Sequence, residues 1–160
     1  MTGDDHGRAE VYAAELAAYE GTELETVVEF DALVVLSDRV MSDAWWSRGH
    51  VQVRRARSDA RSSTTRHTSR TAIHLAAPQM TPATLIHELA HVLAGVDAGH
   101  GARFRRAHVD LACLAFGSDR GQWLEAAYAS AGLALGGRRW TPPAPAQAAR
   151  SAMALGPIAL

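Results

Sequence analysis

Two histidines and a glutamate at H-E-x-x-H spacing are the residues of this sequence that point most directly to chemistry. His87, Glu88 and His91 occupy this pattern inside an otherwise apolar stretch. On a helix, side chains four positions apart lie on one face, with Cβ atoms roughly 5–6 Å apart. Both imidazoles can therefore reach a single Zn²⁺ at about 2.0–2.1 Å. The spacing predicts a zinc site on a helix.

Glu88 follows the first histidine, so its side chain projects about 100° around the helix from that of His87. It can lie beside the ion without binding it. Zinc lowers the pKa of bound water from 15.7 toward about 7, and a neighbouring carboxylate can take the proton as the water attacks a carbonyl. The same carboxyl can then protonate the leaving amine. We predict that Glu88 is the catalytic acid/base of such a reaction.

A third protein ligand is needed, because two histidines and a water leave a tetrahedral ion one ligand short. His100 lies nine residues after His91, beyond a helix stop at Gly95, and is followed by Gly101. A turn and a short loop can return the chain to the metal over this distance. Asp97 is a rival, because it stands where the metzincin pattern H-E-x-x-H-x-x-G-x-x-H places its third histidine.

Five further residues invite a functional interpretation, each beside a simpler one. Tyr128 or His108 would be candidates to stabilise an oxyanion, and Asp110 could accept a hydrogen bond from a ligand histidine. His74 could line a cleft and Cys113 could bind metal. A packing or surface role is the simpler interpretation for each.

Composition suits an ordinary globular domain. The chain has 160 residues, 48% of them apolar, with a formal net charge of -1, so there is no general signal for binding nucleic acid. All basic residues are arginine, which looks like coding bias. The single cysteine excludes an internal disulfide. No apolar run approaches the ~20 residues of a membrane span, and the polar start is unlike a signal peptide. We expect a cytoplasmic, monomeric protein.

The pattern of apolar residues and helix-breaking residues predicts the elements that must position the site. Thr81 and Pro82 suit the cap and first position of the helix that carries the motif, which ends near Gly95. Residues 58–69 are polar and predict an exposed loop. The other predicted elements are helices over residues 8–19, 31–45, 101–116 and 121–133, and strands over residues 51–55 and 71–76.

The segments 87–91 and 100–104 together resemble the H-E-L-x-H … H-G-x-x-F pattern of SprT-like and related zincin metallopeptidases. The wider chain is similar to a small actinobacterial and actinophage family of zinc metallohydrolases. The matching segments are residues 11–15, 38–40 and the pair Trp45-Trp46. Unlike SprT-like proteins, the chain has no Cys-x-x-Cys zinc ribbon and no recognisable DNA-binding tail. The resemblance therefore does not extend to a protease of DNA–protein crosslinks.

The resemblance implies an α+β fold with a minimal zincin-like core. This would be a small, twisted, mainly antiparallel sheet packed on the H-E-x-x-H helix, with about four further helices. It also implies His87, His91 and His100 as ligands of Zn²⁺ and Glu88 as the catalytic residue. We expect a disordered N-terminus over residues 1–7, the domain over 8–136, and a flexible Pro/Ala-rich tail over 137–160.

Three functions compete at this stage. The first is a zinc-dependent peptidase or amide hydrolase acting on a protein or peptide. The second is a zincin-like regulator of the ImmA/IrrE type that cleaves or binds one protein partner. The third is a non-catalytic domain in which four protein ligands enclose a structural zinc. Substrate selection would come from residues 58–69, 71–76 and 96–99.

Overall fold

The computed structural model describes residues 7–144, and this part of the chain has the predicted α+β fold. It contains five α-helices, one three-stranded sheet and three short 3-10 helices. The α-helices are α1 (Arg8–Tyr19), α2 (Phe30–Ser42), α3 (Pro82–Ala94), α4 (Ala102–Phe116) and α5 (Ser118–Ser130). The strands are β1 (Gln52–Arg55), β2 (Thr64–His67) and β3 (Thr71–Leu75), and the 3-10 helices are η1 (Glu23–Glu25), η2 (Ala77–Gln79) and η3 (Val96–Ala98).

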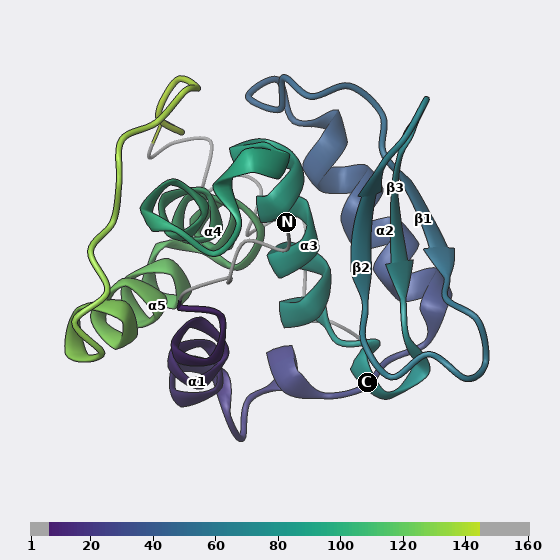
Figure 1. Cartoon of the computed structure of the whole chain (residues 1–160), viewed down its shortest axis with the longest axis horizontal. Coiled ribbons are helices and arrows are strands. Elements are labelled where there is room, and N and C mark those ends of the chain that lie inside the picture. The colour runs from purple at the N-terminus through teal and green to yellow at the C-terminus, as the bar shows by residue number, and fades with distance from the viewer. Residues whose placement is uncertain (1–6, 145–160) are drawn as a thin grey trace.

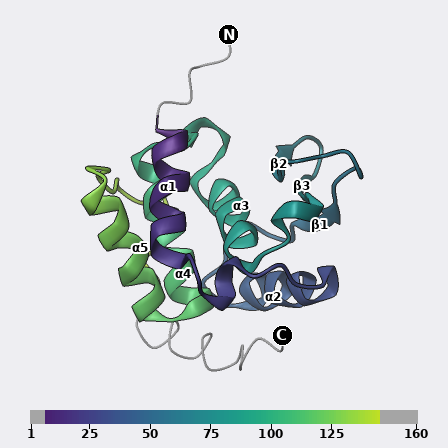
Figure 2. The ribbon, with the colours of Figure 1, turned by 90° about the horizontal axis from the view of Figure 1, so that it is seen from below.

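Helix α3 lies in the middle of the molecule, between a helical half and a sheet half (Figure 1). Helices α1, α4 and α5 lie on one side of it, while the sheet and α2 lie on the other, as the view from below also shows (Figure 2). Eleven of the thirteen residues of α3 are buried, which fits a helix covered on nearly all sides. The predicted motif therefore lies at the centre of the fold.

The ends of α3 are those that the sequence predicted. The Thr81 hydroxyl accepts a hydrogen bond of 3.1 Å from the Thr84 backbone N–H, and Pro82 occupies the first helical position. This cap satisfies one of the backbone donors that a helix start leaves free. At the other end Gly95 adopts a φ of 93°, which L-residues with a side chain rarely adopt. Local chemistry alone thus sets the limits of this helix.

The sheet is mixed, so the prediction of mainly antiparallel pairing was wrong. The strand order is β1-β3-β2, with β3 parallel to β1 and antiparallel to β2. After β1 the chain crosses to the opposite edge, forms β2, and returns through a tight turn as the central strand. Parallel pairing of β1 and β3 follows from this crossover, which residue patterns within single strands do not reveal.

Strand β2 lies within residues 58–69, where an exposed loop was predicted. Its sequence Thr-Thr-Arg-His has no apolar alternation, and only Thr65 is half-buried. Pairing with β3, not hydrophobic burial, makes it a strand, with Thr65 opposite Ile73. An amphipathic pattern is the main sequence signal for a strand, and this one lacks it.

Two helix starts also differ from the prediction. Helix α2 begins at Phe30, and no side chain caps it, so Asp31 is not its N-cap. Helix α5 begins at Ser118, which places Gly121 inside the helix. A Cβ at Gly121 would overlap the sulfur of Cys113 on α4, so the glycine allows the two helices to approach closely. Cys113 thus serves in packing.

Residues beyond α5 pack back onto the domain. Asp110 on α4 forms an ion pair with Arg138 at 2.7 Å and accepts a hydrogen bond of 2.9 Å from the Trp140 indole N–H. The Trp45 indole N–H donates to the Thr141 carbonyl at 2.7 Å. The packed chain therefore continues past residue 136, the last residue of the predicted domain. Residues 1–6 and 145–160 lie outside the described part.

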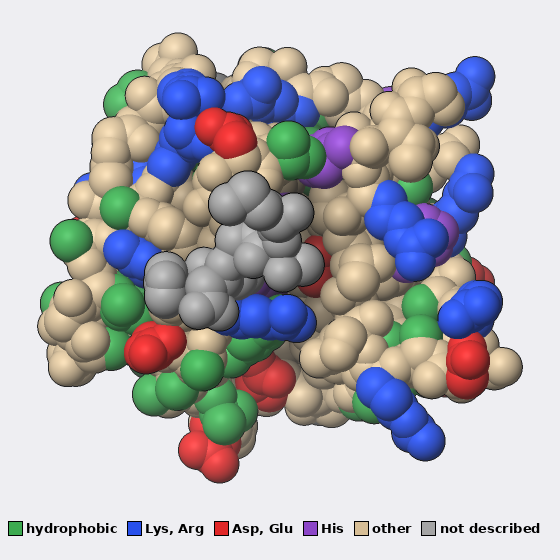
Figure 3. Space-filling view, viewed as in Figure 1, with side chains coloured by type: hydrophobic (Ala, Val, Ile, Leu, Met, Phe, Trp, Pro, Cys, Tyr) green, Lys and Arg blue, Asp and Glu red, His purple; other side chains and the backbone are tan. Residues whose placement is uncertain are grey.

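The surface in Figure 3 carries charges of both signs over both halves of the molecule. Arginine side chains are spread over this face and do not gather in one patch. No helix in residues 7–144 has both the length and the apolar character that a bilayer crossing requires.

Candidate metal centre

The three predicted histidines meet in space. His87 and His91 project from α3, and His100 lies in the loop between η3 and α4. One ring nitrogen of each lies within 4.8 Å of the other two. The Nε2 atoms of His87 and His100 are 3.1 Å apart. The loop after Gly95 thus brings His100 back to the helix, as the spacing predicted.

These distances fit a tetrahedral ion. With zinc–nitrogen bonds of about 2.0–2.1 Å, tetrahedral ligands place their nitrogens about 3.3–3.4 Å apart. The Nε2 separation of 3.1 Å between His87 and His100 is close to this value. Phe104, fully buried, packs against all three rings, with a centroid distance of 4.4 Å to His91 and 4.9 Å to the other two. The histidines are therefore held together before any ion binds.

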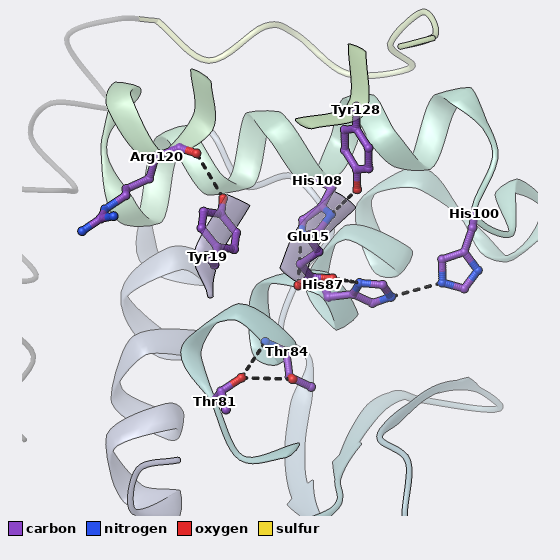
Figure 4. Close-up of polar contacts among 9 residues, drawn as sticks. All are labelled: Glu15, Tyr19, Thr81, Thr84, His87, His100, His108, Arg120 and Tyr128. Atoms are coloured by element: carbon purple, nitrogen blue, oxygen red, sulfur yellow. Dashed lines mark hydrogen bonds and ion pairs between the residues drawn. The ribbon is translucent and has the colours of Figure 1, made fainter. Parts of the chain in front are cut away.

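Glu15 on α1 orients His87. Its Oε2 accepts a hydrogen bond of 2.8 Å from His87 Nδ1, across 72 residues of sequence (Figure 4). The bond leaves Nε2 of His87 free to bind a metal, as a carboxylate behind a ligand histidine commonly does. The sequence suggested Asp110 as one candidate for this role beside a surface role, but Asp110 is paired with Arg138.

The Glu15–His87 pair is buried and behaves as an ion pair. Burial by itself would raise the pKa of Glu15, but attraction to His87 and His108 outweighs it, and the pKa is lowered. Burial would likewise lower the pKa of His87, but the Glu15 carboxylate raises it. Each partner thus favours the charged form of the other.

The other two histidines are fixed differently. Burial, followed by repulsion from His87 and His100, lowers the pKa of His91 to about 2, so its ring stays neutral and keeps a lone pair for a metal. The Arg105 guanidinium donates at 2.8 Å to the His100 carbonyl and at 2.9 Å to that of Ala134. These two hydrogen bonds hold the loop that carries His100 in place.

Asp97, the rival ligand, does not join the three histidines. Its carboxylate pairs with Arg103 at 2.7 Å, and its side chain is 61% exposed. The metzincin spacing therefore does not describe this site.

Glu88 lies in the same region with its own partner. The Thr65 hydroxyl on β2 lies 2.7 Å from Glu88 Oε2 and 3.0 Å from the Glu88 carbonyl oxygen, and can donate to either. Burial raises the pKa of Glu88, against the lowering effects of His87 and Thr65. A carboxyl with a raised pKa is better suited to take and return a proton near neutral pH. The contact depends on β2, the strand that the sequence analysis missed.

The two candidates for an oxyanion-stabilising residue lie in the interior. His108 Nδ1 and the Tyr128 hydroxyl share a hydrogen bond of 2.7 Å, and both side chains are fully buried. Tyr12 instead borders the open side, stacked on the His87 ring at 4.9 Å with an interplanar angle of 10°. Tyr12 and Glu15 were overlooked although both occur in the predicted first helix. A carboxylate on the buried stripe between Val11 and Tyr19 was the available signal.

Glu15, His87 and His108 make a second group whose donor atoms lie within 4.8 Å of one another. His108 Nε2 is 3.6 Å from Glu15 Oε1. Figure 4 shows Tyr128, His108, Glu15, His87 and His100 following one another in a chain of polar contacts. His87 belongs to both groups, through its two ring nitrogens.

A cavity of about 290 Å³ adjoins His87 and Glu88. It lies between α1, η1, η2 and the first turns of α3. Its lining residues are Tyr12, Glu15, Leu16, Glu25, Val27, Pro78, Gln79, Thr81, Thr84, His87 and Glu88.

Comparisons with known proteins add no family assignment. The chain matches no protein-family model, and searches of curated proteins and of solved structures gave no match.

Proposed function

We propose that the protein is a zinc-dependent peptidase or related amide hydrolase, with His87, His91 and His100 as ligands and Glu88 as general base. The observation that carries this proposal is the convergence of three histidine nitrogens beside a buried glutamate. Within residues 7–144 no fourth His, Cys, Asp or Glu donor joins that group. A site with three protein ligands keeps a position for water or substrate, which favours catalysis over a purely structural ion.

A bound zinc ion would polarise the substrate carbonyl and acidify water. The other steps fall to the chain itself. Glu88 takes the proton of the attacking water and delivers it to the leaving amine. Thr65 holds the Glu88 carboxyl at 2.7 Å, and Glu15 holds the ring of His87. Tyr12 packs over that ring on its open side.

The position of β2 supports an extended peptide as substrate. It is an edge strand of the sheet, and its Thr65 contacts Glu88. Unpaired N–H and C=O groups on a strand edge can pair with another extended chain. A peptide that adds to β2 would pass beside the proposed general base.

Metal analysis together with one substitution tests the proposal. Protein purified without chelator should contain about one zinc per chain, and added zinc should raise its melting temperature. Glu88→Gln should keep the zinc and lose about 10²-fold or more of the hydrolysis of a peptide library. Glu29→Gln, an exposed change of the same kind, should leave both unchanged. Metal-free protein that zinc does not stabilise, or full activity in Glu88→Gln, would overturn the proposal.

A further inference from the structure

The cavity beside His87 and Glu88 has the size of one side chain. Its volume of about 290 Å³ is at the lower end of the roughly 300–1,000 Å³ usual for small-molecule pockets. Its lining includes His87 and Glu88 at one side, the first turn of α3, and Glu25 and Val27. A residue beside the bond to be cleaved could insert its side chain here.

Apart from His87, the ionisable groups that could carry charge in this lining near neutral pH are acidic. The lining holds the carboxylates of Glu15, Glu25 and Glu88, and no arginine is among the lining residues. Glu15 is bonded to His87 and Glu88 to Thr65. The side chain of Glu25 has no hydrogen bond or ion pair with any described residue. Glu25 is therefore the carboxylate of this cavity that is free to bind a ligand.

The remaining walls are partly apolar. Leu16 and Val27 are 49% and 55% exposed, and Pro78 is also part of the lining. Exposed aliphatic side chains in front of an unpaired carboxylate suit a ligand with an aliphatic stem and a cationic head. Arginine and lysine side chains have this construction.

The electrostatics of Glu25 agree with a missing counter-ion. Burial, followed by repulsion from Glu15, raises its pKa to about 7. Both effects penalise the ionised carboxylate, and a guanidinium or ammonium group in the cavity would relieve both.

We propose that this cavity is a specificity pocket for an arginine or lysine side chain next to the cleaved bond, and that Glu25 is its specificity-determining residue. The proposal rests on the proposed function, because it concerns the substrate of the same site. It narrows the substrate class from peptides in general to peptides with a basic residue at one position flanking the cleavage site.

Binding of two matched probes tests the pocket without requiring hydrolysis. N-acetyl-arginine methylamide and its neutral isostere N-acetyl-citrulline methylamide differ in charge but hardly in shape. The arginine compound should bind the zinc-loaded full chain about tenfold tighter, as expected for a charge-assisted hydrogen bond. In Glu25→Gln the two should bind equally, whereas Glu29→Gln should keep the tenfold preference. Equal binding of the two probes to the wild type would contradict the proposal that the cavity is a pocket for a basic side chain.

Cleavage of a random peptide library supplies the second readout. Mass spectrometry of the products should show arginine and lysine enriched at one position beside the cut, and Glu25→Gln should remove the enrichment while cleavage continues. Cleavage without basic enrichment would refute the pocket and leave the hydrolase intact. Preferential arginine binding without any cleavage would refute the hydrolase and leave a cation-binding pocket. Melting temperatures of both variants verify that they fold.

Discussion

Two groups of side chains share His87, and they differ in what they can do. The open group (His87, His91, His100) is made of histidines that lie beside Glu88 and next to a cavity. The closed group (Glu15, His87, His108) combines two histidines with a carboxylate, and all three side chains are buried, although Glu15 also lines the cavity. Within each group the donor atoms lie within 4.8 Å of one another. Distance alone therefore does not show which group is better suited to bind a metal.

Charge and access separate the two groups. In the closed group Glu15 already neutralises His87 at 2.8 Å, and burial, more than any other cause, lowers the pKa of His108 to about 4. In the open group three ring nitrogens converge, and no carboxylate is a member of the group. A cation is bound where the lone pairs of several donor atoms converge. In the proposed site the closed group would thus support one ligand, His87, and the open group would supply all three ligands.

Removing the shared residue should have the largest effect. His87→Ala breaks both groups and leaves Glu15 as a buried charge without its main partner. We expect a loss of about 3–5 kcal/mol in the free energy of unfolding without metal, together with loss of zinc binding. His91→Ala, the matched control, should also abolish zinc binding but cost only about 1 kcal/mol, because His91 has no carboxylate partner. Urea denaturation in the presence of a chelator measures the free energy of unfolding of the two variants. Equal losses of stability would contradict the division into two groups.

The support that the closed group gives to the open one should appear in zinc affinity. Glu15→Gln keeps a hydrogen-bond acceptor for His87 but removes the charge. We expect zinc to bind about 10–100-fold more weakly, the usual cost of losing such a partner. Glu10→Gln changes an exposed residue of the same helix and should have no effect. Competition with a chromophoric chelator gives both constants, and unchanged affinity in Glu15→Gln would show that Glu15 does not act on the metal.

The far end of the closed group should matter for stability and not for catalysis. Tyr128→Phe removes the hydroxyl that bonds His108 at 2.7 Å. A loss of about 1 kcal/mol in unfolding free energy is expected from one buried hydrogen bond, with kcat within about twofold of the wild type. A tenfold loss in kcat would restore Tyr128 as a candidate for stabilising the oxyanion.

The smallest expected effect is on the pH dependence of stability through Glu25, whose carboxyl interacts electrostatically with Glu15 and His87. Its pKa is raised to about 7 in the folded protein from an ordinary 4.5, so the folded state binds this proton more tightly than the unfolded state. Stability must then fall as pH rises between these values. Glu25→Gln has no carboxyl group to titrate at this position. Between pH 4.5 and 7 the free energy of unfolding of the wild type should therefore fall by up to about 1 kcal/mol relative to that of the variant. Parallel denaturation curves over this range would contradict the raised pKa.

Sequence reasoning succeeded where the controlling interactions are local. Thr81 and Gly95 limit α3 through contacts within a few residues, and this predicted the helix bearing the motif. It failed where a side chain is recruited from elsewhere. Thr65 lies in a strand without apolar alternation, and Tyr12, which is 37% exposed, stacks on His87 from another helix.

The sequence by itself determined that His87 and His91 share one face of a helix, because the helical period places residues four apart together. It also indicated His100 through a helix stop and a short return. Only the tertiary structure decided that Glu15, 72 residues from His87, orients that ring, and that Glu25 faces the adjoining cavity. The reason is physical: these contacts depend on how α1 and η1 pack beside α3, and no local periodicity encodes that packing.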